Sequence, residues 1–433
     1  MRRWFLAALL APAMAVAQGT PGSEGRQIAL AEAVRLAQQN APASVIARGA
    51  MRTTAAAARS AYGAFTPTIT GTMGGSNTVG QVISPQGVIG PYTGQPWNSS
   101  LGITATMPLF TGLSRIYAVR GARADETTAD ANELAARYNV AFQVKQQYFA
   151  ALAAKEAVSA AKSQLDAADQ QFKASAARVQ AGAATKSDSL RSVIAVGNAR
   201  LALLTARNNV RNANAALTRL VQSAVPVTPI AADTADPVLV TLDSAALLGL
   251  AEDGPAVRAS KAQLSSSQAA AKAALGSYLP AVSLSYGTTG NNPQQNYSPV
   301  GAAAYQNVLR LQLSYVLTNG LVREQGVVNT RVAEENANAQ LRDALFLARQ
   351  NFAQQLGLLR TAEQQIIIQH ASVEAADEDL RVQTQRYTLG ASTLLDVLTS
   401  QTALNQARAA LIQARFDYRN AKAQLEQLVG RDL

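Results

Sequence analysis

The clearest pattern in the chain is a seven-residue hydrophobic repeat that occurs twice, in residues 196–220 and 404–428. In both segments the apolar positions are separated by alternating steps of three and four residues. Such a 3.5-residue repeat keeps one stripe of a helix against a partner and predicts left-handed supercoiling, although an ordinary helical bundle shares this periodicity. The stripe residues are Val196, Ala199, Leu203, Ala206, Val210, Ala213, Leu217 and Leu220, and Leu404, Ala407, Leu411, Ala414, Tyr418, Ala421, Leu425 and Leu428.

A much longer helix is predicted before each of these segments. Neither the stretch from Gly112 to Gly182 nor the one from Gly320 to Gly390 contains a proline, and helix-forming residues dominate both. About seventy residues rising 1.5 Å each form a rod of roughly 100 Å. Each rod ends at a glycine-containing turn and is followed by a striped helix. We therefore predict two long antiparallel helical hairpins.

Between the first helix and the rod of each half, the hydrophobic period changes to two. Leu309, Leu311 and Leu313 alternate with polar residues, and Leu101 and Ile103 do the same in the first half. Segments of about ten residues with one apolar face are typical of transmembrane barrel strands. A soluble β-sandwich is the alternative. Residues 80–98 and 290–305 are rich in Gly, Pro, Asn and Gln, and we expect them to be extracellular loops.

This pattern predicts four strands per chain, which cannot close a barrel alone. Open strand edges are not tolerated in lipid, and about eight strands is the usual minimum for closure. Two copies would give an eight-stranded barrel filled by its own side chains, whereas three would give twelve strands and room for water. A conduit therefore requires three copies and twelve strands.

The two halves are copies of one unit. A shift of 208 residues relates Gly182 to Gly390 and Asp188 to Asp396, and a shift of 213 relates Pro42 to Pro255. Each copy is expected to contain a helix, a pair of strands and a long hairpin. The predicted boundaries are a signal peptide 1–17, an N-terminal extension 18–27, repeat one 28–222, a linker 223–239, repeat two 240–430 and a tail 431–433, with strand pairs at about 65–110 and 279–317 and hairpins at 112–222 and 320–430.

The N-terminus has the pattern of a secretory signal. Arg2 and Arg3 precede an apolar run over residues 4–16, and Ala15-Val16-Ala17 supplies small residues for cleavage. A buried N-terminal helix explains neither feature. The chain has no cysteine, so an anchor on an N-terminal lipidated cysteine is excluded. We expect an exported protein.

Composition argues against catalysis. The chain is 48% hydrophobic but only 5% aromatic, with a mean hydropathy of +0.00, which indicates alanine-rich helix packing. With no cysteine and one histidine, His370, it has no thiolate or histidine-rich metal set. No nucleophile–base pair or phosphate-binding loop is visible, so we expect neither an enzyme nor a cofactor. The net charge of +10 is spread along helices without an aromatic platform, which argues against nucleic acid as a partner.

Three sequence elements carry a family resemblance. They are the early helix from Leu30 to Pro42, the segment Pro108-Leu109-Phe110-Thr111-Gly112 after a strand, and an Arg-x-x-x-Gly-x-x-Thr-x-x-Asp turn that starts at Arg178 and again at Arg386. In this order and spacing the chain resembles the TolC-type outer membrane efflux proteins over its mature length. The resemblance implies a mainly helical homotrimer with a helical periplasmic tunnel (an α-barrel), and a twelve-stranded β-barrel in outer membrane lipid. It also implies a periplasmic adaptor protein and an inner-membrane pump as partners.

The resemblance also assigns roles to the two turns, which would form the periplasmic tips of the tunnel. The expected adaptor-docking residues are Gly182, Ala183, Thr185, Gly390, Ala391 and Thr393, and the expected gate residues are Asp188, Tyr387, Asp396, Ser187, Ser392 and Thr399. In some family members an Asp matching Asp188 and a Tyr matching Tyr387 form a tether that holds the entrance shut. Helix capping is an equally good and compatible role for Asp188 and Asp396.

Two departures from the family pattern affect the expected gate. Ser392 stands where those members have an arginine that pairs with a hydroxyl residue matching Ser187, so that contact is in doubt. Asp396 matches a ring of aspartates at the constriction, but Thr399 stands at the position of a second such aspartate.

We expect the protein to be a duct for the passive export of small molecules or polypeptides. A secreted alanine-rich coiled-coil structural protein is the alternative.

Overall fold

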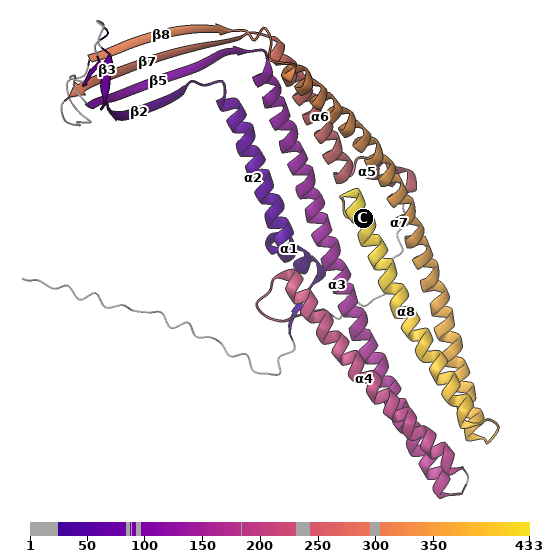
Figure 1. The fold of residues 1–433 in the computed structure, drawn as a ribbon. Coiled ribbons are helices and arrows are strands. Elements are labelled where there is room, and N and C mark those ends of the chain that lie inside the picture. Colours follow the sequence, from indigo (N-terminus) through magenta and orange to yellow (C-terminus); the bar gives the residue numbers. More distant parts are fainter. Residues whose placement is uncertain are drawn as a thin grey trace, which may run out of the picture.

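The computed structural model describes residues 25–83, 87, 89–91, 97–182, 184–230, 243–294 and 304–433. The chain is elongated, with a β-sheet at one end and the tips of two helical hairpins at the other (Figure 1). The expected signal peptide lies outside the described residues, as do most of the N-terminal extension and most of the linker.

The two hairpins follow the predicted duplication. Hairpin 1 consists of α3 (Ser114–Gln180) and α4 (Lys186–Val221), and hairpin 2 of α7 (Val322–Thr388) and α8 (Leu394–Val429). All four boundaries of hairpin 2 lie 208 residues after those of hairpin 1. Within the described part of the chain, no helix is both long enough and apolar enough to cross a membrane.

The seven-residue stripe holds each hairpin together. On α4, Val196 and Ala199 are buried against Ala168 of α3, and Leu203 and Ala206 against Ala161. On α8, Leu411 and Leu425 belong to one buried cluster with Phe352 and Leu359 of α7. Alternating large residues with alanine allows the paired backbones to approach closely. The side of α3 not used by α4 packs against α8, so that the two hairpins lie side by side (Figure 1).

The single helix expected at the start of each repeat is two helices. In repeat one they are α1 (Leu30–Asn40) and α2 (Pro42–Gly63), and in repeat two they are α5 (Ser244–Glu252) and α6 (Pro255–Leu275). Proline lacks an N–H donor and cannot continue a helix, but its fixed φ suits the first helical position. Pro42 and Pro255 therefore end one helix and begin the next.

Four strands form one antiparallel sheet. They are β2 (Thr68–Asn77), β5 (Trp97–Thr111), β7 (Ala281–Gln294) and β8 (Ala304–Ser314), in the order β2-β5-β7-β8. The central β5–β7 pair joins the two repeats, and β2 and β8 are open edges. The predicted alternation leaves large apolar side chains exposed, among them Leu309, Leu311, Leu313, Ile69 and Ile103.

The expected loops and linker contain short strands that the sequence pattern does not reveal. Within the stretch 80–98, β3 (Gln81–Ile83) pairs with β4 (Ile89–Pro91). Within the predicted linker, β6 (Val227–Pro229) pairs in parallel with β1 (Arg26–Ile28). These strands are only three residues long, too short for alternation to identify them.

Buried Tyr148 of α3 fixes the β1–β6 pair. Its hydroxyl donates to the carbonyl of Ile28 at 3.1 Å and accepts from the N–H of Ile230 at 3.3 Å. Ile28 and Val227 are fully buried in the same cluster as Tyr148 and Leu217. The start of repeat one and the beginning of the linker are thus packed on hairpin 1.

Two glycines allow the sheet to join the helices. Gly112 has a φ of +61°, and a Cβ there would lie 2.1 Å from the carbonyl oxygen of Gly276. A Cβ on Gly276 would lie 2.5 Å from the carbonyl oxygen of Gly112. Neither position accepts a side chain without backbone movement.

Candidate functional site

The expected site residues lie at the hairpin tips, at the lower end of the molecule in Figure 1. Gly182 and Gly390 adopt left-handed conformations, with φ values of +70° and +76°, and the space around each is open. Glycine adopts this backbone geometry without strain. Ala391 and Thr393 are exposed in the second turn and Thr185 in the first, whereas Ala183 lies outside the described residues.

Each tip is closed by a reciprocal cap at the start of the returning helix. Thr185 donates its backbone N–H to Asp188 Oδ2 at 3.1 Å, and its hydroxyl accepts from the Asp188 N–H at 3.3 Å. Thr393 and Asp396 repeat the arrangement at 2.8 and 3.3 Å. Asp188 and Asp396 are therefore helix-capping residues, whether or not they also contribute to a gate.

The second cap has an electrostatic consequence. The backbone N–H of Thr393, which donates to the carboxylate, holds the pKa of Asp396 below its ordinary value. The Thr393 hydroxyl and the charge of Arg386 act in the same direction. Because this pKa is lower in the folded state, the cap is fully stabilising above the unfolded-state pKa and is lost as the pH falls through the folded-state value.

We expect the α8 cap to persist through mildly acidic pH and to fail below the ordinary aspartate pKa of about 4. Hydrogen-exchange protection of the backbone amide at position 393, which donates to the Asp396 carboxylate, should stay constant down to that pH and then fall, once corrected for intrinsic exchange. In Thr393→Val, which lacks the hydroxyl, protection should decrease at a higher pH than in the parent. A decrease in the parent already between about pH 6 and 5 would show that the cap does not depend on this carboxylate.

Tyr387 contacts Arg178 rather than Asp188. The Arg178 guanidinium lies over the Tyr387 ring, 4.5 Å from its centroid, and donates to the Tyr387 carbonyl at 2.9 Å. The ring packs beside Leu394 and Val397, and the buried Tyr387 hydroxyl has no hydrogen-bond partner among the described residues. The cross-hairpin contact at the tips is therefore a cation–π and hydrogen-bond pair from α3 to α7.

The other expected gate residues bond locally or are exposed. Ser392 donates to the carbonyl of Gln383 at 3.2 Å, and Thr399 to that of Leu395 at 2.8 Å. Ser187 is exposed. A single chain thus brings each Asp to its own Thr, but it does not bring Asp188 to Tyr387. Sequence reasoning missed the role of Arg178, although this residue begins the quoted turn motif.

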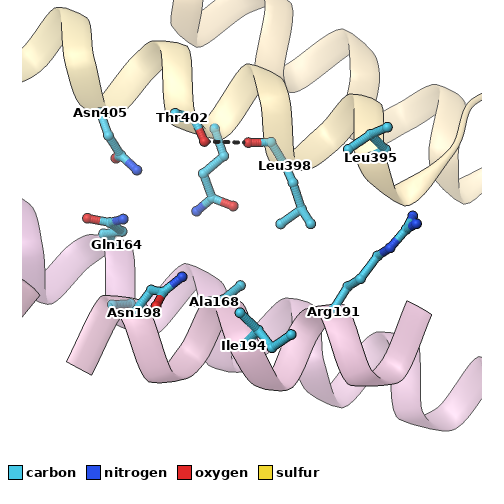
Figure 2. Close-up of a pocket in the computed structure, with 12 residues that line it drawn as sticks. Gln164, Ala168, Arg191, Ile194, Asn198, Leu395, Leu398, Thr402 and Asn405 are labelled. Atoms are coloured by element: carbon cyan, nitrogen blue, oxygen red, sulfur yellow. Dashed lines mark hydrogen bonds between the residues drawn. The ribbon is translucent and has the colours of Figure 1, made fainter. Parts of the chain in front are cut away.

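Above the tips, a groove separates hairpin 1 from α8. One cavity of about 360 Å³ is lined by residues of α3, α4 and α8, and a second of about 680 Å³ continues along the same helices. Figure 2 shows Gln164, Asn198 and Arg191 facing Leu398, Thr402 and Asn405 across the first cavity. Amide, hydroxyl and alanine side chains here leave space that larger apolar residues would fill.

Ion pairs connect α3 to α8 along this groove. Lys145 Nζ lies 2.5 Å from Glu426 Oε2, and the two side chains are only 16% and 8% exposed. Further toward the tips, Arg415 lies 3.8 Å from Glu156. Together with Arg178 and Tyr387, these contacts hold hairpin 1 to hairpin 2 at three levels. No group of acidic or histidine side chains among the described residues has the arrangement of a metal site.

Three solved structures are similar to this chain. CusC has a TM-score of 0.81 at 16% identity, over 94% of this chain and 93% of CusC. The outer membrane protein VceC of Vibrio cholerae has 0.78 at 18%, over 93% and 96%. The outer membrane channel CmeC of Campylobacter jejuni has 0.80 at 17%, over 93% and 85%. These likenesses confirm the predicted fold.

Sequence comparison identifies the family directly. No curated protein matches the chain. A model of the outer membrane efflux protein family matches residues 33–222 and 250–431, which cover nearly all of both repeats. The family is one of channels and not a class of enzymes, and it gives no support to a secreted coiled-coil structural protein. The chain belongs to the outer membrane efflux protein family.

Proposed function

We propose that three copies of this chain form a passive duct from the periplasm to the cell exterior. The observation that carries the proposal is the four-stranded sheet with open edges β2 and β8, joined to helices of 67 residues. In lipid these edges must be paired, and β8 of one copy can pair with β2 of the next. Three copies close a twelve-stranded barrel wide enough for water.

The helical part then extends the pore into the periplasm. An α-helix of 67 residues is about 100 Å long, much more than the thickness of a bilayer. The apolar face of the sheet contacts outer membrane lipid, while polar residues of the helices line the tunnel. Export of the protein itself relies on the N-terminal signal sequence. No energy source is needed within the duct, because an inner-membrane pump drives transport.

The hairpin tips are proposed to bind a periplasmic adaptor that links the duct to this pump. At Gly182 and Gly390 the turns are open, with no neighbouring atoms where a side chain would project. A partner can therefore approach the backbone closely. Asp188, Tyr387 and Asp396, with Ser187, Ser392 and Thr399 nearby, would then form the region that opens when the adaptor binds.

Channel recordings test this proposal. The purified protein in detergent should have the mass of three chains and should conduct ions in planar bilayers. A monomer that remains soluble without detergent would contradict the proposal.

Asp396→Asn should reduce cation selectivity, because three carboxylates leave the constriction. The matched control is Asp188→Asn, which alters the equivalent cap of α4 but not this ring. The reversal potential in a salt gradient measures the effect. An equal shift in both variants would show that the effect is not specific to the Asp396 carboxylates, and no shift in Asp396→Asn would remove this carboxylate from the pore.

A further inference from the structure

Cationic side chains lie where four helices meet the sheet. The helices α2 and α6 end, and α3 and α7 begin, at the same end of the four-stranded sheet (Figure 1). Arg115 and Arg323 are the second residues of α3 and α7, and Arg59 and Lys272 lie in the last turns of α2 and α6. At 1.5 Å per residue, each lies within about 6 Å of a helix end. We call these four residues the cationic collar.

The duplication preserves the collar and keeps acidic residues out of it. The shift of 213 residues relates Arg59 to Lys272, and the shift of 208 relates Arg115 to Arg323. No aspartate or glutamate occurs in residues 33–124 or 254–323, which include the whole sheet. Glu324 follows Arg323 directly, but adjacent helical residues point in different directions. The charge of this region is therefore almost entirely positive.

Aromatic rings hold the two arginines of the collar in equivalent positions. The Arg115 guanidinium lies 4.9 Å from the centroid of the Phe65 ring, and that of Arg323 lies 4.8 Å from the Tyr278 ring. Phe65 and Tyr278 are themselves related by the shift of 213. Each arginine also donates to the carbonyl seven positions earlier. Among the described residues, Arg115 uses three of its five N–H groups and Arg323 two, so donors remain for a ligand.

The other two cations lie on an exposed face that is partly apolar. Three residues after Arg59 and Lys272, and so on the same side of each helix, stand Tyr62 and Leu275, both 44% exposed. Nearer the sheet, Leu321 is 73% exposed. A water-filled lumen favours polar walls, whereas cations beside exposed apolar and aromatic residues are typical of the boundary between lipid and water.

Resting on the proposed barrel in outer membrane lipid, we propose that the cationic collar binds the phosphate groups of anionic phospholipids in the periplasmic leaflet. Guanidinium and ammonium groups form charge-assisted hydrogen bonds with phosphate oxygens, and their aliphatic stems lie along the apolar surface. The sheet itself carries one charged residue, Arg310, which lies on the face opposite to Leu309 and Leu311. The collar thus sets the depth of the sheet in the bilayer.

Lipid binding by the purified full chain tests this inference. In detergent micelles with increasing mole fractions of phosphatidylglycerol, native mass spectrometry counts the lipids bound per oligomer. Arg59→Gln/Lys272→Gln should raise the half-saturating mole fraction about fivefold or more, which is the usual contribution of a cation at an anionic lipid surface. The matched control Arg207→Gln/Arg211→Gln removes two exposed cations from α4 and should bind like the parent.

Further arms of the experiment identify the ligand. Phosphatidylcholine, which has a phosphate but no net charge, should bind much more weakly than phosphatidylglycerol. Equal binding of the two lipids, or an equal loss in the α4 control, would overturn the collar as an anionic lipid site. Displacement of phosphatidylglycerol by inorganic phosphate, but not by chloride at the same ionic strength, would assign the site to free phosphate instead. These results leave a conducting trimer intact, whereas a monomer without conductance would contradict the duct itself.

Discussion

Replacing Lys145 with methionine should lower the free energy of unfolding by about 3 kcal/mol, because it leaves the Glu426 carboxylate buried without its cation. Glu426 is 8% exposed and lies 2.5 Å from Lys145 Nζ; its other oxygen accepts from the N–H of Leu433 at 3.3 Å. This ion pair joins α3 of repeat one to the end of α8. Denaturant unfolding of the detergent-solubilised protein, followed by circular dichroism, measures the loss.

A second substitution distinguishes the lost charge from lost packing. In Lys145→Met/Glu426→Met no charge remains buried, and most of the stability should return. As a control, Arg258→Ala removes an ion pair with Asp253 whose side chains are 53% and 63% exposed, and should cost less than about 1 kcal/mol. If Lys145→Met were as mild as Arg258→Ala, the carboxylate would be solvated or neutral in the native protein.

The hairpins could be predicted closely because their signal is long and repeated. A stripe such as Leu404 to Leu428 contains eight periodic positions, and its copy 208 residues earlier excludes coincidence. Local chemistry marks the same ends in both copies: glycine in the turn, then threonine and aspartate in the cap. Hydrophobic periodicity, turn residues and helix caps all predict the same hairpin, so its structure follows from local sequence and does not depend on knowing the tertiary contacts.

The unpredicted features depend on contacts between distant segments. The strand Val227–Pro229 exists because Arg26–Ile28 lies beside it, and both are held by Tyr148. A strand of three residues is too short for its own sequence to indicate which distant segment it pairs with. The division of the first helix into α1 and α2, by contrast, could have been predicted from Pro42, because proline is favoured at the first position of a helix.

The tip contact between Arg178 and Tyr387 shows the same limit. The turn motif is repeated in both copies, but position 387 is a tyrosine where its counterpart, Val179, is aliphatic. That difference breaks the equivalence of the tips and allows an arginine of hairpin 1 to bind a ring of hairpin 2. A position-by-position comparison of the two copies would have singled out Tyr387 as the position at which the two tips differ.

Removing the Arg178 guanidinium should raise the single-channel conductance of the purified protein several-fold. Arg178→Ala eliminates both the cation–π contact with the Tyr387 ring and the hydrogen bond to the Tyr387 carbonyl. Both contacts join the hairpins close to the tips; in the proposed trimer this is the gate region, where a small separation of the helices would widen the pore most. Each contact is worth on the order of 1 kcal/mol, and in the proposed trimer three copies would act together. Recordings in planar bilayers measure the change.

Two variants show which tip contact matters. Arg386→Ala removes the repeat-equivalent arginine, whose hydrogen bond goes to Ala391 in its own turn, and should leave conductance near the parent value. Tyr387→Phe keeps the ring under Arg178 but deletes a hydroxyl that has no hydrogen-bond partner in the part of the chain that the structure describes. If Arg178 holds the tips, Tyr387→Phe conducts like the parent. If Tyr387→Phe instead opens the channel and Arg178→Ala does not, the tyrosine hydroxyl acts through another copy, as expected of a tether to Asp188.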